Sequence, residues 1–97
     1  MEEEDSGKLG DIYLSKHASK RMGERRLSMD EVREAIKNPV QHVYDRWRDV
    51  YIAVSGRGVA VVYAMHGGRI EVLTVLSKRE YEALISKYGL KRYKTIY

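Results

Sequence analysis

Hydrophobic residues near the start of the chain recur at the spacing of a helix. Leu14, Ala18 and Met22 lie four residues apart, which places them on one face of a helix. Ser15 is suited to cap such a helix at its N-terminus. Gly23 is a poor residue for a helix interior because its backbone loses much freedom on ordering. The pattern therefore predicts a first helix from about Ser15 to about Gly23.

A second helix has clearer boundaries. Ser28 and Glu31 have the spacing of a capping box, in which each side chain satisfies an unpaired backbone N–H of the other. Asn38 precedes Pro39, and the residue before a proline is pushed out of the helical region. We expect a helix between these signals, with a buried stripe of Val32, Ala35 and Ile36.

From residue 40 onward the apolar positions alternate with a period of two, which is typical of strands. Glycine-containing turns are expected at 55–58 and 66–68. The predicted strands span residues 41–46, 49–55, 59–65 and 69–76.

The last part of the chain predicts one more helix. Ser77 and Glu80 form another capping box, which opens a helix through about Tyr88, and Gly89 is well placed to end it. Residues 91–97 are expected either to add a short edge strand or to remain loose.

Two helices, a run of strands and a final helix predict an α+β domain. We expect two N-terminal helices packed on one face of a four-stranded antiparallel sheet. The other face would be open or partly covered by the C-terminal helix. Residues 12–97 would form this single domain, and residues 1–11, which are polar and acidic, would form a flexible tail.

The amino-acid composition limits the cellular environments in which we expect the protein. The chain has 97 residues and no cysteine, so disulfides and cysteine-bound metals are excluded. No apolar stretch approaches the roughly 20 residues that span a bilayer, and the acidic start does not resemble a signal peptide. We expect a soluble cytoplasmic protein that does not associate with membranes.

The net charge of +4 is unevenly distributed. The first eleven residues carry five acidic side chains and one lysine, a net charge of −4, so the remainder carries +8. A basic body points to a polyanionic partner, most often a nucleic acid.

One run of residues carries candidate chemistry. His17, Arg21 and Arg25 recur every fourth residue and would lie above one another on one helix face. Guanidinium groups bind phosphate, and imidazole moves protons near neutral pH. Lys20 and Arg26 of the same run are candidate nucleic-acid contacts. The alternative is a solvated basic helix face with His17 at its edge.

A second basic cluster lies near the C-terminus, where lysines can neutralise phosphates and tyrosines can stack on bases. Its members are Lys87, Lys91, Arg92 and Lys94, interleaved with Tyr88, Tyr93 and Tyr97. The alternative is a basic tail whose tyrosines pack on the sheet edge. Trp47 either stacks on a base or, as we favour, caps a hairpin.

Polar side chains on the central strands are further candidates. Tyr63 and Thr74 either project toward a substrate or pack in the core with a satisfied polar tip. The histidines lack the clustered spacing of metal ligands, so we expect no metal and no cofactor.

Taken together, these residues resemble a small prokaryotic domain of uncharacterised function. Its members follow the pattern H-A-x-x-R-M-x-E-R-x-I-S-x-x-x-V and end in a V-x-T-V-like strand. The corresponding residues here are His17-Ala18, Arg21-Met22, Glu24-Arg25, Leu27-Ser28, Val32 and Val72–Val75. Arg26 departs from the pattern, because glycine is frequent at its position.

That family is similar in layout to RelE/ParE-like and BrnT-like toxins, which include metal-independent ribonucleases and partners of antitoxins. The resemblance implies a RelE-like fold, with His17, Arg21 and Arg25 in the opening motif and Thr74 in the last strand. The leading hypothesis is a toxin-like, metal-independent endoribonuclease or RNA-binding domain with RNA and a small antitoxin as partners. The alternative is a non-catalytic nucleic-acid-binding or protein-interaction module.

Overall fold

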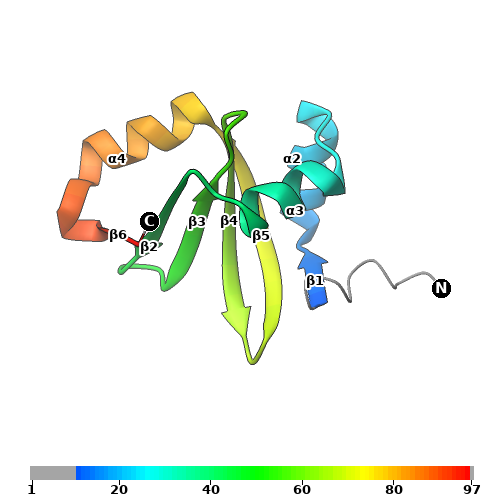
Figure 1. Ribbon diagram of the computed structural model, residues 1–97, viewed down its shortest axis with the longest axis horizontal. Helices are drawn as coiled ribbons and strands as arrows, with labels where there is room; N and C mark the ends of the chain where they lie inside the picture. The colour runs from blue at the N-terminus through cyan, green and yellow to red at the C-terminus, as the bar shows by residue number, and fades with distance from the viewer. Residues whose placement is uncertain (1–10, 97) are drawn as a thin grey trace.

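The computed structural model describes residues 11–96 and has an α+β fold (Figure 1). These residues form three helices and six strands. They are β1 (Asp11–Leu14), α2 (Lys16–Arg25), α3 (Met29–Lys37), β2 (Gln41–Asp45), β3 (Val50–Val54), β4 (Val59–His66), β5 (Arg69–Ser77), α4 (Lys78–Arg92) and β6 (Tyr93–Thr95).

All six strands form one sheet in the order β1-β5-β4-β3-β2-β6. Strands β2 to β5 form the expected antiparallel meander, because hydrogen-bonded hairpins join consecutive strands. Strand β6 pairs antiparallel with β2, and β1 pairs parallel with β5. Both ends of the chain therefore extend the meander by one strand.

Helices cover both faces of this sheet and create two separate cores (Figure 1). On one face, Ala18 of α2 and Val32 of α3 are fully buried in a cluster with Val61 and Val72. On the other face, Tyr81 of α4 is buried in a cluster with strand residues of β2, β3 and β4. The alternation of side chains along each strand supplies both faces at once.

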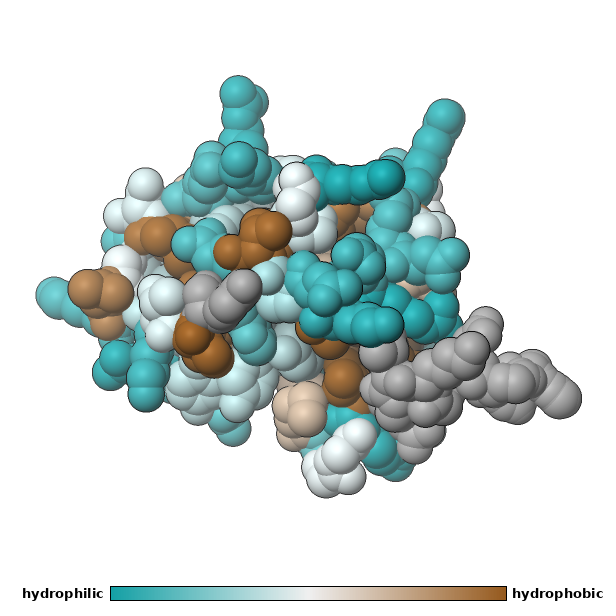
Figure 2. Space-filling view, viewed as in Figure 1, coloured by the Kyte–Doolittle hydropathy of each residue, from teal (hydrophilic) through white to brown (hydrophobic). Residues whose placement is uncertain are grey.

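The surface of the molecule is mixed in character. In the view of Figure 2, apolar side chains emerge in separate spots between hydrophilic ones rather than as one continuous patch. None of the helices within residues 11–96 is long and apolar enough to cross a membrane.

The prediction of four strands was wrong, because β1 and β6 enlarge the sheet to six. Leu14 belongs to β1 and pairs with Val72, although we had assigned it to the buried stripe of the first helix. Strand β1 is only four residues long and pairs with a strand more than fifty residues away, so no local pattern reveals it. Of the two alternatives for the C-terminal residues, a short edge strand or a loose segment, the edge strand is present as β6.

Helix boundaries were better predicted than strand number. The capping boxes at Ser28 and Ser77 are both present, and the backbone leaves helical geometry at Gly89, where φ is +57°. Helix α2 continues through Gly23 to Arg25 and ends at Arg26, whose φ is +57°. The expected acidic tail over residues 1–11 lies outside the described residues, apart from Asp11, where β1 begins.

Candidate functional site

A β-bulge in β5 turns Thr74 toward the face that α4 covers. Val62 of β4 pairs with Thr74, whereas the next residue, Tyr63, pairs with Val72. Leu73 is therefore an extra residue in β5. As a result, Val72 and Val75 both point into the core beneath α2 and α3, and Thr74 between them points the other way.

Thr74 lines a cavity of about 400 Å³ between the sheet and α4. The floor and one wall are apolar and consist of Val50, Ile52, Val62, Leu73, Leu76 and Leu84. Polar groups approach it from three directions: His17 from α2, Arg48 from the β2–β3 turn, and Tyr88 and Arg92 from α4. Such a mixture of apolar lining and a few polar groups is typical of ligand sites.

His17 reaches this cavity because the start of α2 is fixed to the bulge. The Ser15 N–H donates to the carbonyl of Val72 at 2.9 Å, and the Ser15 hydroxyl donates to the carbonyl of Leu73 at 2.9 Å. The same hydroxyl accepts from the N–H of Ala18 and so caps the helix. His17 and Thr74, which are 57 residues apart in the sequence, therefore line the same cavity, and His17 is exposed.

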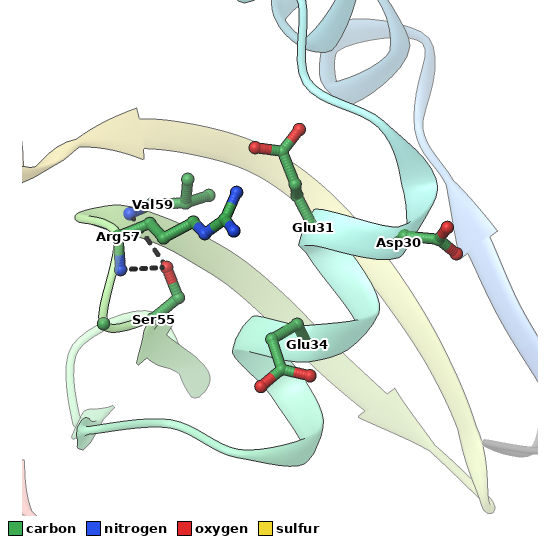
Figure 3. A pocket seen from close by; sticks show the side chains of 7 residues that line it. Asp30, Glu31, Glu34, Ser55, Arg57 and Val59 are labelled. Atoms are coloured by element: carbon green, nitrogen blue, oxygen red, sulfur yellow. Dashed lines mark hydrogen bonds between the residues drawn. The ribbon is translucent and has the colours of Figure 1, made fainter.

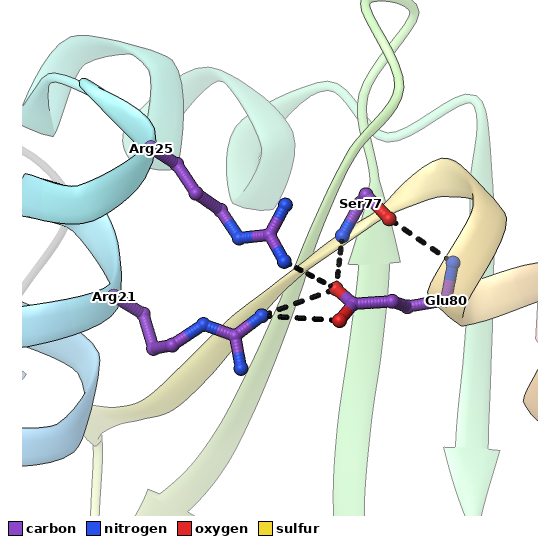
Figure 4. A network of polar contacts seen from close by, with 4 residues as sticks. All are labelled: Arg21, Arg25, Ser77 and Glu80. Atoms are coloured by element: carbon purple, nitrogen blue, oxygen red, sulfur yellow. Dashed lines mark hydrogen bonds and ion pairs between the residues drawn. The ribbon is translucent and has the colours of Figure 1, made fainter.

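The two arginines of the predicted run are not free to act with His17, because both bind Glu80 (Figure 4). Arg21 Nη2 lies 3.1 Å from Glu80 Oε1 and 3.3 Å from Oε2, and Arg25 Nη2 lies 2.7 Å from Oε1. These ion pairs connect α2 with the first turn of α4. In this structure both guanidinium groups are therefore paired with Glu80 rather than solvated alone, and their binding of phosphate stays a prediction.

Glu80 also completes the capping box of α4. Its Oε1 accepts from the N–H of Ser77 at 2.9 Å. This backbone hydrogen bond lowers the pKa of Glu80, and the nearby charges of Arg25 and Arg21 lower it further, which together outweigh the opposing effect of burial. Glu80 is thus held as a carboxylate. Sequence reasoning identified it only as a helix cap, and nothing in the spacing indicated its partners on α2.

Arg92 has a structural role that the sequence did not indicate. Its guanidinium donates to both carboxylate oxygens of Asp45 at 3.0 and 2.9 Å, and Asp45 is only 2% exposed. The guanidinium also lies 4.6 to 5.2 Å from the ring centres of Tyr88, Trp47 and Tyr93. The guanidinium of Arg92 is therefore engaged by Asp45 and surrounded by these rings, and its contact with nucleic acid stays a prediction.

Asp45 also lines this cavity and is the carboxylate that binds Arg92. Burial alone would raise its pKa, but hydrogen bonds from Arg92 and from the N–H groups of Trp47 and Arg48 reverse the effect, so the pKa is lowered. Trp47 lies in the β2–β3 turn and is 60% exposed, with its ring edge-on to Tyr88. The interpretation of Trp47 as a hairpin cap fits this position.

Tyr63 does not belong to this cavity. It pairs with Val72 and therefore lies on the face beneath α2 and α3, opposite to Thr74. Its hydroxyl is 2.9 Å from Nε2 of His42, and its ring stacks on Tyr51. Burial lowers the pKa of His42, which favours a neutral imidazole as the partner of this hydroxyl. Tyr63 therefore packs in the core, which was the alternative to a position facing a substrate.

The remaining candidate residues lie at the surface. Their contacts with nucleic acid stay predictions, since the structure holds no partner; they are Lys20, Arg26, Lys87, Lys91 and Lys94, all exposed. Arg48 is exposed at the cavity and makes no ion pair among residues 11–96. It was missed because a single arginine in a turn has no distinctive spacing.

A second cavity, of about 450 Å³, lies between α3 and the β3–β4 turn (Figure 3). Arg57 extends toward α3, and Asp30, Glu31 and Glu34 surround the space. Its predominantly acidic lining disfavours an anionic ligand. No group of three histidine or acidic side chains within residues 11–96 has the geometry to hold a metal ion.

Residues 14–77 match a family described as a domain of unknown function (DUF4258), and the chain belongs to this family. The match includes His17 and Thr74 but ends before α4, which supplies the other wall of the cavity. No curated protein and no solved structure matches the chain, so the comparisons provide no link to RelE/ParE-like or BrnT-like toxins.

Proposed function

We propose that this protein is a toxin-like, metal-independent endoribonuclease. Single-stranded RNA would bind at the cavity between the sheet and α4, which His17 of α2 also lines. The observation that carries the proposal is the convergence of His17, Thr74 and Arg48 on one partly apolar cavity. Its apolar walls suit the face of a nucleobase, and its polar groups suit the sugar and phosphate.

The chemistry available to these side chains is transfer of a phosphodiester within one nucleotide. The ribose 2′-hydroxyl attacks the adjacent phosphorus, the bond from phosphorus to the 5′-oxygen breaks, and a 2′,3′-cyclic phosphate forms. His17 accepts the proton of the 2′-hydroxyl, and a proton from solvent is taken up by the leaving 5′-oxygen. Arg48, and the Arg21–Arg25 pair if released from Glu80, would stabilise the charge that develops on the phosphate oxygens.

The test is incubation of RNA with the protein in excess EDTA, followed by analysis of the cleavage products. Cleavage should persist without metal, and His17→Ala should lower its rate by roughly 100-fold, as expected for loss of a general base. His66→Ala is the matched control, because His66 is an exposed histidine at the end of β4, outside the cavity. Absence of cleavage by the unaltered protein, or an equal loss in both variants, would refute the enzymatic proposal.

The ion pairs of Glu80 favour a second candidate, a non-catalytic RNA-binding module. They engage both guanidinium groups that lie on the same helix as His17 in the free protein. Such a module would bind RNA in a salt-dependent way and without turnover, and binding would be insensitive to His17→Ala. A protein-interaction role with a small acidic antitoxin would appear instead as co-purification of that partner from the native host.

A further inference from the structure

One oxygen atom, Oε1 of Glu80, accepts three hydrogen bonds from three different residues. Arg21 Nη2 lies 3.1 Å away, Arg25 Nη2 lies 2.7 Å away, and the Ser77 backbone N lies 2.9 Å away (Figure 4). Two of these donors come from consecutive turns of α2, and the third lies at the junction of β5 and α4. The chain thus builds a site for one anionic oxygen from separate elements.

This set of donors is also the one that a phosphate oxygen prefers. Guanidinium groups recognise phosphate and carboxylate with the same planar donor geometry, and a backbone N–H adds a third charge-assisted bond. The anion present here is on a side chain that is 42% exposed, while the two arginine side chains are 22% and 32% exposed. Glu80 therefore has space to turn away into solvent, whereas the arginines are better fixed.

We propose that Arg21, Arg25 and the N–H of Ser77 form a binding site for an RNA phosphodiester, and that Glu80 occupies this site until RNA displaces it. The proposal rests on the RNA-binding function proposed above. It assigns to Glu80 the role of an internal competitor, which weakens binding of isolated anions and leaves the site available to a polyanion held at several points.

Displacement of Glu80 does not require α4 to unravel. The Ser77 hydroxyl accepts from the N–H of Glu80 at 3.1 Å, and this half of the capping box is independent of the carboxylate. Partly exposed ion pairs of this kind contribute little to stability, so a phosphate that makes equivalent contacts can replace them.

Glu80→Gln removes the competition with little change in structure. Glutamine can replace glutamate at this position of a capping box, because its carbonyl oxygen can still accept from the N–H of Ser77. Glu82→Gln is the matched control, because Glu82 lies on the same helix, is exposed, changes the net charge equally and makes no ion pair within the described part of the chain. Thermal unfolding followed by circular dichroism checks that both variants are folded.

Fluorescence anisotropy with a single-stranded RNA oligonucleotide at low salt gives the first readout. Glu80→Gln should bind about tenfold more tightly than the unaltered protein, the effect of losing an anion that makes two ion pairs, and Glu82→Gln less than about twofold more tightly. The gain should disappear when Arg21→Ala is added to Glu80→Gln. An equal gain in both glutamine variants, or a gain that persists without Arg21, would overturn the role of Glu80.

A titration with inorganic phosphate at constant ionic strength separates this inference from the proposed function. The side-chain N–H signals of Arg21 and Arg25 in NMR spectra should shift at lower phosphate concentration in Glu80→Gln than in the unaltered protein. If phosphate shifts them equally in both proteins, the site is not one that Glu80 blocks. If the phosphate result is as expected but no variant binds RNA, the anion site stands and the RNA-binding function is wrong.

Discussion

The hydroxyl of Thr74 is buried at the atomic level, yet it finds no hydrogen-bond partner among residues 11–96. A buried polar group without a partner costs about 1–3 kcal/mol. Thr74→Val, which replaces the hydroxyl by a methyl group of similar size, should therefore raise the free energy of unfolding by about 1 kcal/mol. Urea denaturation measures this change.

Thr95→Val is the control for this substitution, because Thr95 is exposed on the edge strand β6 and its change should be within about 0.5 kcal/mol. A loss of stability in Thr74→Val would show that the hydroxyl is satisfied in solution. A gain would show that the residue is retained at a cost in stability, as expected for a side chain that contacts a ligand.

Arg26 has a strained backbone conformation at the C-terminal end of α2. Its φ of +57° and ψ of +41° are left-handed, and its N–H and that of Leu27 bond back to Gly23 and Met22 to end α2. A residue with a side chain is strained there, whereas glycine adopts this conformation without strain. Arg26→Gly should raise the free energy of unfolding by about 0.5–1 kcal/mol. Arg26→Ala keeps the strain while removing the same charge, so thermal unfolding should show no such gain for alanine.

At the scale of elements, the buried pair of Asp45 and Arg92 joins β2 to the end of α4. Asp45→Ala leaves the guanidinium of Arg92, whose side chain is only 11% exposed, without its anion. Breaking such a pair typically costs about 3–5 kcal/mol, a large part of the stability of a small domain. The variant should unfold at clearly lower urea concentration. Asp30→Ala, which removes a surface pair with Arg33, should cost less than about 1 kcal/mol.

The same pair predicts a dependence on pH. Because the pKa of Asp45 is lowered in the folded protein, the unfolded chain takes up a proton first as the pH falls. Its contribution to stability is complete above the ordinary aspartate pKa of about 3.9 and is lost as the pH falls through the lowered value. Urea denaturation between pH 6 and pH 2 should show a smaller acid-dependent loss in Asp45→Ala than in the unaltered protein. An identical loss in both would assign the acid sensitivity to other carboxylates.

Local signals in the sequence were sufficient to predict most helices and strands, but they did not predict which side chains meet at the candidate site. The capping boxes at Ser28 and Ser77 and the glycine at position 89 fix helix ends through nearby atoms, so they could be read directly. Strand β1, the bulge at Leu73 and the partners of Glu80 all depend on contacts between distant segments. His17 was identified by its motif, but the cavity that it lines also includes Thr74 and Arg48 and not the two arginines on its own helix.

At the scale of the whole molecule, the basic character is less available than the sequence suggests. Arg21, Arg25 and Arg92 are all engaged with buried or partly buried carboxylates. Under the proposed function, we expect the exposed lysines near the end of α4 to attract RNA toward the cavity. Cation–π contact with Tyr88 leaves the ammonium group of Lys87 exposed to such a partner.

This arrangement predicts how RNA binding depends on salt. Replacing Lys87, Lys91 and Lys94 by alanine should reduce the slope of log affinity against log salt concentration by about 2, because each phosphate contact on a single strand contributes roughly 0.7. Fluorescence anisotropy at several salt concentrations measures the slope. The matched variant replaces the exposed residues Lys37, Arg57 and Arg69, which removes the same charge from other parts of the surface. Equal reductions in the two triple variants would mean that net charge alone attracts RNA. A reduction confined to the first would mean that RNA contacts the lysines beside α4, next to the cavity that holds His17 and Thr74.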